Sequence, residues 1–301
     1  MGAADLIPGI SGGTIALITG IYKNLLDSID SLNYKNLSLI KNGNLKMFWK
    51  KINGNFLLTV FSGIILSILI FSYLIDWLIE NRPIQLWSFF FGVLITSIFF
   101  LKKLVNNWNL FSLVFLIFGI LISYQLTTFP LKDNDTTLLY LFFCGIAGSI
   151  AMILPGISGA YIFLILGVYH TLLNSIKMAT KVWSSFKWEI FYETFLILSV
   201  TAIGFLIGLR FFASILKKLI EKNNDKTMSI LIGLMIGSIQ KIWPWQEVVN
   251  VNINNKNLFY SKAILPYNYN GNPEILTSLI VMITAILLTI FLGSKNLTHN
   301  K

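Results

Sequence analysis

The chain reads Pro8-Gly9-Ile10-Ser11-Gly12-Gly13 near its start, and 147 residues later it reads Pro155-Gly156-Ile157-Ser158-Gly159-Ala160. When residues 8–29 are laid against residues 155–176, 14 of the 22 positions are identical. Proline interrupts a helix because it lacks an N–H donor and clashes with the preceding turn. Interrupted apolar segments at corresponding places in two halves of a chain are typical of a transport site near the middle of a membrane.

The composition predicts a polytopic membrane protein. Of the 301 residues, 55% are apolar and 12% are charged, which is about half the charged fraction of soluble domains. Stretches long and apolar enough to span a bilayer cover residues 56–79, 84–101, 110–126, 191–216, 227–242 and 275–292. The single cysteine, Cys144, excludes a disulfide framework. The net charge of +10 comes mostly from lysines that flank the spans, which argues against nucleic-acid binding.

The duplication divides the chain into two membrane repeats, residues 1–130 and 131–301, within a single integrated all-α domain. Each repeat holds one broken or re-entrant helix pair, residues 1–29 or 138–176, followed by about three spanning helices. An odd number of spans per repeat predicts that the two repeats have inverted topology. A second echo supports this division, because Gly92-x4-Ser97 recurs as Gly233-x4-Ser238. Almost nothing precedes Asp5, so we expect the first repeat to lack its leading half-helix.

Lysine placement agrees with inverted repeats. If residues 23–55 lie in the cytoplasm, fourteen lysines fall on that side and eight basic residues fall on the other. Such a bias is the usual sign of cytoplasmic loops. The segment 241–273 then lies at the outer face, where its tryptophans and tyrosines would form an interfacial belt.

The repeated turns are candidate binding sites for an anion. Glycines allow close approach of another group, successive free N–H groups can form an anion-binding nest, and the helix that follows adds the positive end of its dipole. The alternative is that these small residues serve only close helix packing. The predicted substrate-binding residues of the turns are Pro8, Gly9, Ser11, Gly12, Gly13, Thr14, Pro155, Gly156, Ser158 and Gly159.

Two charged residues complete the candidate site. Arg210 lies inside the apolar stretch 191–216, where an arginine is costly and usually has a partner or a function. It could clamp a phosphate, because guanidinium matches phosphate oxygens in a fork, or its side chain could reach toward the membrane surface. Asp5 is three residues before Pro8. It could carry a coupling H⁺ or Na⁺, or pair with Arg210 or a lysine.

These residues resemble the bacterial polyprenyl-phosphate transporter family, formerly catalogued as a domain of unknown function. The resemblance covers nearly the whole chain and rests on residues 2–14, the second Pro155-Gly156-Ile157-Ser158-Gly159, and residues 233–238 leading to Trp243-Pro244-Trp245. It implies an undecaprenyl-phosphate translocase, a multi-pass protein of the bacterial cytoplasmic membrane that returns the lipid carrier of cell-wall synthesis to the inner leaflet. The family pattern has an apolar segment before the first motif, which is not found before Asp5.

The residues themselves leave other functions open. The same turns would suit a secondary transporter or channel for a small soluble anion, and that path should be a sealed polar cavity. A scaffold without transport would keep the two turns apart and fill them with apolar side chains. Paired carboxylates, metal-ligand spacings and a Ser/His/Asp set do not occur in the apolar segments, so we expect neither an enzyme nor a cofactor.

Overall fold

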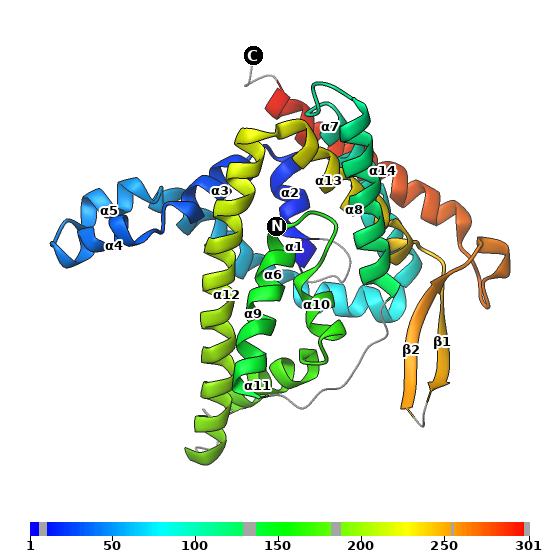
Figure 1. The fold of residues 1–301 in the computed structure, drawn as a ribbon. Coiled ribbons are helices and arrows are strands. Elements are labelled where there is room, and N and C mark those ends of the chain that lie inside the picture. Colours follow the sequence, from blue (N-terminus) through cyan, green and yellow to red (C-terminus); the bar gives the residue numbers. More distant parts are fainter. Residues whose placement is uncertain (6–10, 129–136, 182–187, 254–255, 298–301) are drawn as a thin grey trace.

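A computed structural model describes the fold for residues 1–5, 11–128, 137–181, 188–253 and 256–297. The described chain is mainly helical, as predicted, and Figure 1 shows most of the helices in one bundle, from which α4 and α5 extend to one side. In chain order the elements are α1 Gly2–Asp5, α2 Gly12–Ile18, α3 Tyr22–Asp30, α4 Tyr34–Lys41, α5 Leu45–Lys51, α6 Gly54–Asn81, α7 Pro83–Lys102, α8 Leu110–Thr128, α9 Leu138–Ile153, α10 Gly159–Ile165, α11 Tyr169–Lys181, α12 Trp188–Lys222, α13 Asn224–Gly237, η1 Ile239–Ile242, β1 Gln246–Ile253, β2 Lys256–Ala263, η2 Pro266–Asn268 and α14 Ile275–Leu297.

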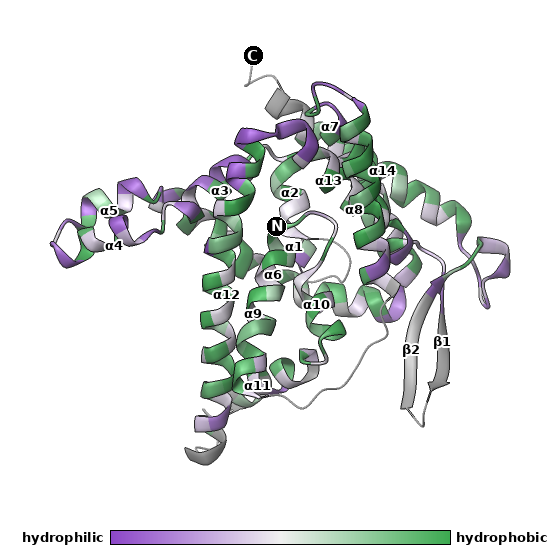
Figure 2. Ribbon diagram, in the orientation of Figure 1, coloured by the Kyte–Doolittle hydropathy of each residue, from purple (hydrophilic) through white to green (hydrophobic). Residues whose placement is uncertain are grey.

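Four of the six predicted spans, residues 84–101, 110–126, 191–216 and 275–292, are confirmed as helices of spanning length. Residues 56–79 lie within α6, but the prediction of one span over residues 227–242 is wrong, because α13 ends at Gly237 and the separate 3-10 helix η1 follows. Within the described residues, four helical stretches are long and apolar enough to cross a membrane: Pro83–Lys102, Leu110–Thr127, Phe191–Lys222 and Ile275–Gly293. Helix α12 has 35 residues, so at 1.5 Å per residue it exceeds the roughly 30 Å of hydrocarbon it has to cross. Figure 2 shows these helices apolar along most of their length, with hydrophilic residues gathered on α4, α5 and the connection between α12 and α13.

Helices assigned by sequence to the two predicted repeats pack against each other. Helix α7 of the first repeat packs along α14 of the second, and α13 of the second packs along α8 of the first. The repeated glycines, Gly92 and Gly233, allow the helices to approach closely at both contacts. A Cβ on Gly92 would lie 2.6 Å from the Met282 carbonyl oxygen of α14, and a Cβ on Gly233 would collide with the Leu116 carbonyl oxygen of α8. Duplicated sequence therefore makes equivalent contacts, each with a helix of the other repeat.

Each broken segment contains one more break than the sequence predicts. The sequence analysis predicted one broken or re-entrant helix pair in each segment, and the helix expected after each Pro-Gly turn is itself divided. The two parts are α2 and α3 in the first segment, and α10 and α11 in the second. The division falls at Gly20 and Gly167, which have φ values of 70° and 71°. This left-handed conformation ends a helix and favours glycine. Ahead of the turns, α1 has four residues and α9 has sixteen.

The segment after η1 also differs from expectation. It contains an antiparallel hairpin in which Gln246 pairs with Ala263 and Ile253 pairs with Lys256, whereas the sequence analysis predicted no strand. The predicted interfacial belt is wrong for Trp245, which is buried and donates its indole N–H to the Pro273 carbonyl oxygen at 2.8 Å. Tyr267, in contrast, is exposed.

Candidate functional site

The described part of the first motif, from Ser11 onward, meets the second turn inside the bundle. The Ser11 hydroxyl donates to the Leu154 carbonyl oxygen at 2.8 Å, and the Gly156 N–H donates to the Thr14 hydroxyl oxygen at 3.2 Å. Ser11 and Thr14 are fully buried. Residues more than 140 positions apart are thus joined by direct hydrogen bonds, which a scaffold with separated turns would not show.

Close backbone approach explains why small residues occur at this contact. A Cβ on Gly13 would collide with the Ile153 carbonyl oxygen, and that same oxygen accepts a hydrogen bond from the buried Tyr22 hydroxyl at 3.1 Å. On the other side, Gly156 has a φ of 82° and its Cα faces the backbone of Met235 on α13. The second turn is therefore held between α2, α3 and α13.

Asp5 satisfies the N-terminal end of α2. Its Oδ1 accepts a hydrogen bond from the Gly12 N–H at 2.6 Å, while Oδ2 is buried without a hydrogen-bond partner in the described part of the chain. A carboxylate at this end of a helix is favourable. In this conformation the Gly12 N–H, predicted to contact the substrate, is thus used by the protein's own carboxylate.

The second turn contains a buried hydroxyl, that of Ser158, that is available to bind a ligand. Ser158 is 1% exposed, and its hydroxyl has no hydrogen-bond partner among the described residues. A buried unpaired hydroxyl is costly, so Ser158 is a suitable ligand for an incoming polar group. Pro155, Gly156 and Gly159 lie in the same turn or directly after it, whereas Pro8 and Gly9 lie outside the described residues.

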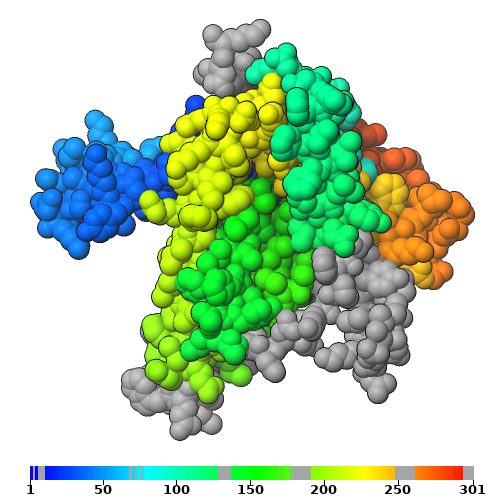
Figure 3. Space-filling model, in the orientation of Figure 1, coloured from blue at the N-terminus to red at the C-terminus, as the bar shows by residue number. Residues whose placement is uncertain are grey.

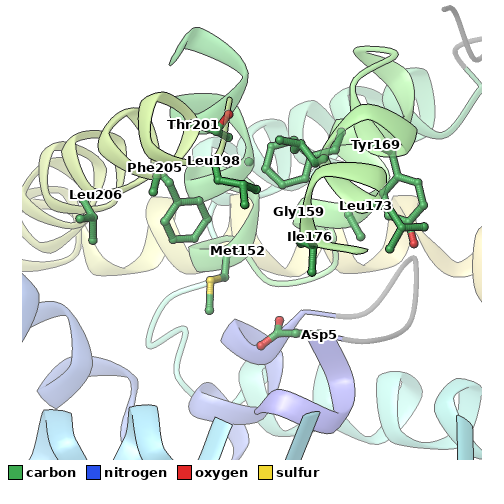
Figure 4. Close-up of a pocket in the computed structure, with 15 residues that line it drawn as sticks. Asp5, Met152, Gly159, Tyr169, Leu173, Ile176, Leu198, Thr201, Phe205 and Leu206 are labelled. Atoms are coloured by element: carbon green, nitrogen blue, oxygen red, sulfur yellow. The ribbon is translucent and has the colours of Figure 1, made fainter. Parts of the chain in front are cut away.

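An apolar cavity of about 510 Å³ borders this site. Figure 4 shows Asp5 and Met152 at one end and the side chains of α10, α11 and α12 around the remainder. Ile176 and Leu206, on its walls, are 52% and 63% exposed, so the cavity opens sideways at the apolar surface. The lining consists of Asp5, Gly148, Met152, Gly159, Ala160, Phe163, Tyr169, Leu172, Leu173, Ile176, Leu198, Thr201, Ala202, Phe205 and Leu206.

The predicted cation is elsewhere. Arg210 is on the exposed surface of α12 and is absent from the cavity lining. A different cation, Lys241 of η1, lies beside the second turn, with its Nζ 4.8 Å from the centre of the Tyr161 ring. Tyr161 is on α10, three residues after Ser158. Sequence reasoning missed Lys241 because it assigned residues 241–273 to the outer loop.

Together, these features define a multi-pass membrane protein in which two broken helical segments meet beside a laterally open apolar cavity. The chain belongs to the VCA0040-like, undecaprenyl phosphate translocase-like family, whose sequence model matches residues 1–260. The predicted family resemblance is confirmed.

Two curated relatives carry the name polyprenyl-phosphate transporter. The protein from Vibrio cholerae serotype O1 is 39% identical over 254 residues, which cover 84% of this chain and 78% of the relative. The protein from Staphylococcus aureus is 29% identical over 256 residues, which cover 81% of this chain and 83% of the relative. No solved structure gives a significant match.

Proposed function

We propose that this protein translocates undecaprenyl phosphate across the bacterial cytoplasmic membrane and so recycles the lipid carrier of the cell envelope. The observation that carries the proposal is the cavity that extends from Asp5 and Gly159, next to the paired turns, to the exposed side chains of α11 and α12. A polyprenyl phosphate has a small anionic head and a long apolar chain. The chain can stay in lipid or in the cavity, while the head needs polar groups to replace its water.

The turns supply such groups. The Ser158 hydroxyl, which has no hydrogen-bond partner within the described ranges, and the ammonium of Lys241 near α10 are candidates to contact the phosphate. The hydroxyls of Ser11 and Thr14 become available if the turns separate. The phosphate-binding role of Arg210 remains a prediction; in this proposal its guanidinium, at the surface of α12, is the first cation that the lipid head group meets. Alternating access of the two repeats would expose the turns to each leaflet in turn.

Asp5 suits the coupling role predicted for it. A phosphate beside this carboxylate experiences like-charge repulsion, which favours protonation of Asp5 or a cation between the two groups. Uptake of H⁺ or Na⁺ would therefore accompany entry of the phosphate. Asp5→Asn should transport without responding to a proton or sodium gradient, and Asp5→Glu should retain part of that response.

The transport test uses proteoliposomes with undecaprenyl phosphate in both leaflets and an added phosphatase. Phosphatase reaches only the outer leaflet, so hydrolysis beyond that pool reports translocation. We expect Ser158→Ala with Arg210→Ala to abolish this second phase, Lys241→Gln to slow it at least fivefold, and Gly63→Ala, at an open position on α6, to leave it intact. A wild-type rate in the double variant would overturn the site assignment.

The alternative substrate is a small soluble anion. Only one charged side chain, Asp5, lines the cavity within the described residues, and the cavity is apolar and open at its side, which is unlike a sealed polar path. Uptake of radioactive inorganic phosphate by the same proteoliposomes, without phosphatase-detected lipid movement, would favour this alternative.

A further inference from the structure

The two repeats place the same helical hairpin in different surroundings. In the second repeat, α10 and α11 line the cavity through Gly159, Ala160, Phe163, Tyr169, Leu172, Leu173 and Ile176. Subtracting the repeat offset of 147 gives Gly12, Gly13, Ala16, Tyr22, Leu25, Leu26 and Ile29 on α2 and α3. All seven residues of the first repeat are buried. The five larger ones are between 0% and 6% exposed, whereas Ile176, the counterpart of Ile29, is 52% exposed.

The first-repeat face is covered by the second repeat. Helix α3 packs along α12, and the Tyr22 hydroxyl donates to the Ile153 carbonyl oxygen. At the end of this contact the Lys217 ammonium lies 2.9 Å from Asp27 and 3.4 Å from Asp30. The second repeat has Asn174 and Lys177 where the first has these acids, so this ion pair belongs to the closed side alone.

The side chains of the two faces are nearly the same. Five of the seven positions are identical, and only Gly13 and Ala16 differ from their counterparts Ala160 and Phe163. A face that tolerates an open cavity in one repeat is therefore chemically able to do so in the other. A ligand shifts a protein between two conformations when these differ by only a few kcal/mol and the ligand binds one of them better.

We propose that α2 and α3 carry a second binding site for a prenyl chain, closed in this structure, which opens as the cavity beside α10 and α11 closes. The ligand class is the apolar chain of a prenyl lipid, because the face is built from the same leucine, isoleucine and tyrosine side chains as the open cavity. The inference rests on the proposed function, since it assigns the two sites to one lipid at two stages of its passage. Opening would break the contacts of Lys217 with Asp27 and Asp30.

The test is photolabelling of the reconstituted protein with diazirine-tagged farnesyl phosphate, followed by mapping of the labelled peptides. Wild type should be labelled mainly on 159–176. Ala202→Trp fills the open cavity and should lower that labelling at least fivefold while raising labelling on 12–29. Ile203→Trp is the matched control, because Ile203 is its exposed neighbour on α12 and does not line the cavity.

A second variant keeps the test decisive if Ala202→Trp fails to fold. Lys217→Met should raise labelling on 12–29 severalfold, whereas Lys218→Met, at an exposed neighbour, should not. The inference is overturned if residues 12–29 are labelled no more than the lipid-facing α8 in every variant while wild type still translocates undecaprenyl phosphate. Diazirine-tagged farnesol distinguishes the second prenyl site from the proposed function. If its labelling moves from residues 159–176 to residues 12–29 in the same variants as the labelling by farnesyl phosphate, and no lipid phosphate is translocated, the second site is supported and the proposed function is refuted.

A different observation carries a second inference. Helices α4 and α5 form an arm that extends sideways from the bundle, across the direction of α12 (Figures 1 and 3). Residues 31–53 contain five lysines and no acidic residue. Neither α4 nor α5 has a buried residue, and the arm exposes large apolar side chains such as Tyr34, Leu45 and Met47.

We infer that this arm lies on an anionic phospholipid surface. Apolar and aromatic side chains beside lysines are the composition of helices that lie in the membrane interface, and the lysines complement negative lipid heads. The arm leads directly into α6, to which Trp49 is tied by a 2.8 Å hydrogen bond from its indole N–H to the Asn55 side-chain oxygen. The arm is therefore held at the end of a helix of the membrane bundle.

Spin labelling tests this placement in nanodiscs. A nitroxide at Met47→Cys, in a Cys144→Ser background, should be more accessible to oxygen than to a water-soluble nickel chelate when the lipid includes phosphatidylglycerol. Replacing all five lysines of the arm by glutamine should shift the label toward the nickel reagent. Equal, water-like accessibility in phosphatidylglycerol and in pure phosphatidylcholine, with and without the lysines, would overturn the inference.

Discussion

The contact between the second turn and α13 predicts a measurable effect of Gly156→Ala. Gly156 has a φ of 82°, and an L-residue in this conformation costs about 1–2 kcal/mol. Its added Cβ would lie 2.8 Å from the Met235 Cα, whereas ordinary contact begins at 3.4 Å. The turn must therefore move by about 0.6 Å relative to α13.

The displacement should also break the bond between the turns. The Gly156 N–H reaches the Thr14 hydroxyl oxygen at 3.2 Å, close to the upper limit for such a bond. Hydrogen bonds between helices in membranes contribute about 0.6 kcal/mol on average and up to about 1.7 kcal/mol. Together with the backbone strain, we expect Gly156→Ala to lower the free energy of unfolding by about 2–4 kcal/mol.

Unfolding in mixed detergent micelles, followed by circular dichroism, measures this loss. Gly43→Ala is the matched control, because Gly43 has a φ of 73° and no atom within 4 Å of its added Cβ. It should show the backbone strain alone, about 1–2 kcal/mol. If Gly156→Ala and Gly43→Ala are equally stable and translocate equally, the argument that the second turn is clamped between α13 and α2 is refuted.

Three further outcomes follow from single contacts. Tyr22→Phe leaves the Ile153 carbonyl oxygen without its 3.1 Å partner, so it should lower the unfolding free energy by about 1–3 kcal/mol; an unchanged unfolding midpoint would contradict this. Gly233→Leu drives a side chain into α8 and should abolish folded protein in detergent extracts, whereas Gly63→Leu, with open space around it, should not. Backbone N–H groups of residues 106 and 107 hold the pKa of Asp225 below its usual range. This carboxylate therefore stabilises the folded state above its unfolded pKa of about 3.9, and the stabilisation is lost as the pH falls through the lower folded pKa. Asp225→Asn should remove this part of the pH dependence of unfolding, and an acid unfolding curve identical to that of wild type would count against it.

Much of the fold could be predicted from local sequence. The spans follow from uninterrupted apolar stretches, because a bilayer requires about 20 apolar residues per helix. The turns follow from Pro155 and Gly156, which act on their own segment of backbone. The breaks at Gly20 and Gly167 were missed because an isolated glycine in a helical pattern is only a weak signal. The strands β1 and β2 were missed because their polar residues were assigned to a loop.

The sequence by itself contains one motif twice, and from this it predicts two copies of one membrane unit, each with a broken helix. It also determined the family, because the motifs are specific and span most of the chain. Hydropathy, helix breaking and repetition are properties of contiguous residues, so they can be recognised without a structure.

Only the tertiary structure decided how the two copies differ in use. It paired Ser11 with the Leu154 carbonyl oxygen and the Gly12 N–H with Asp5, left the Ser158 hydroxyl without a partner in the part of the chain that the structure describes, and placed Arg210 on the surface. It also closed one copy of a shared face and opened the other. Such choices depend on which distant segments pack together, and identical local sequences are compatible with either packing.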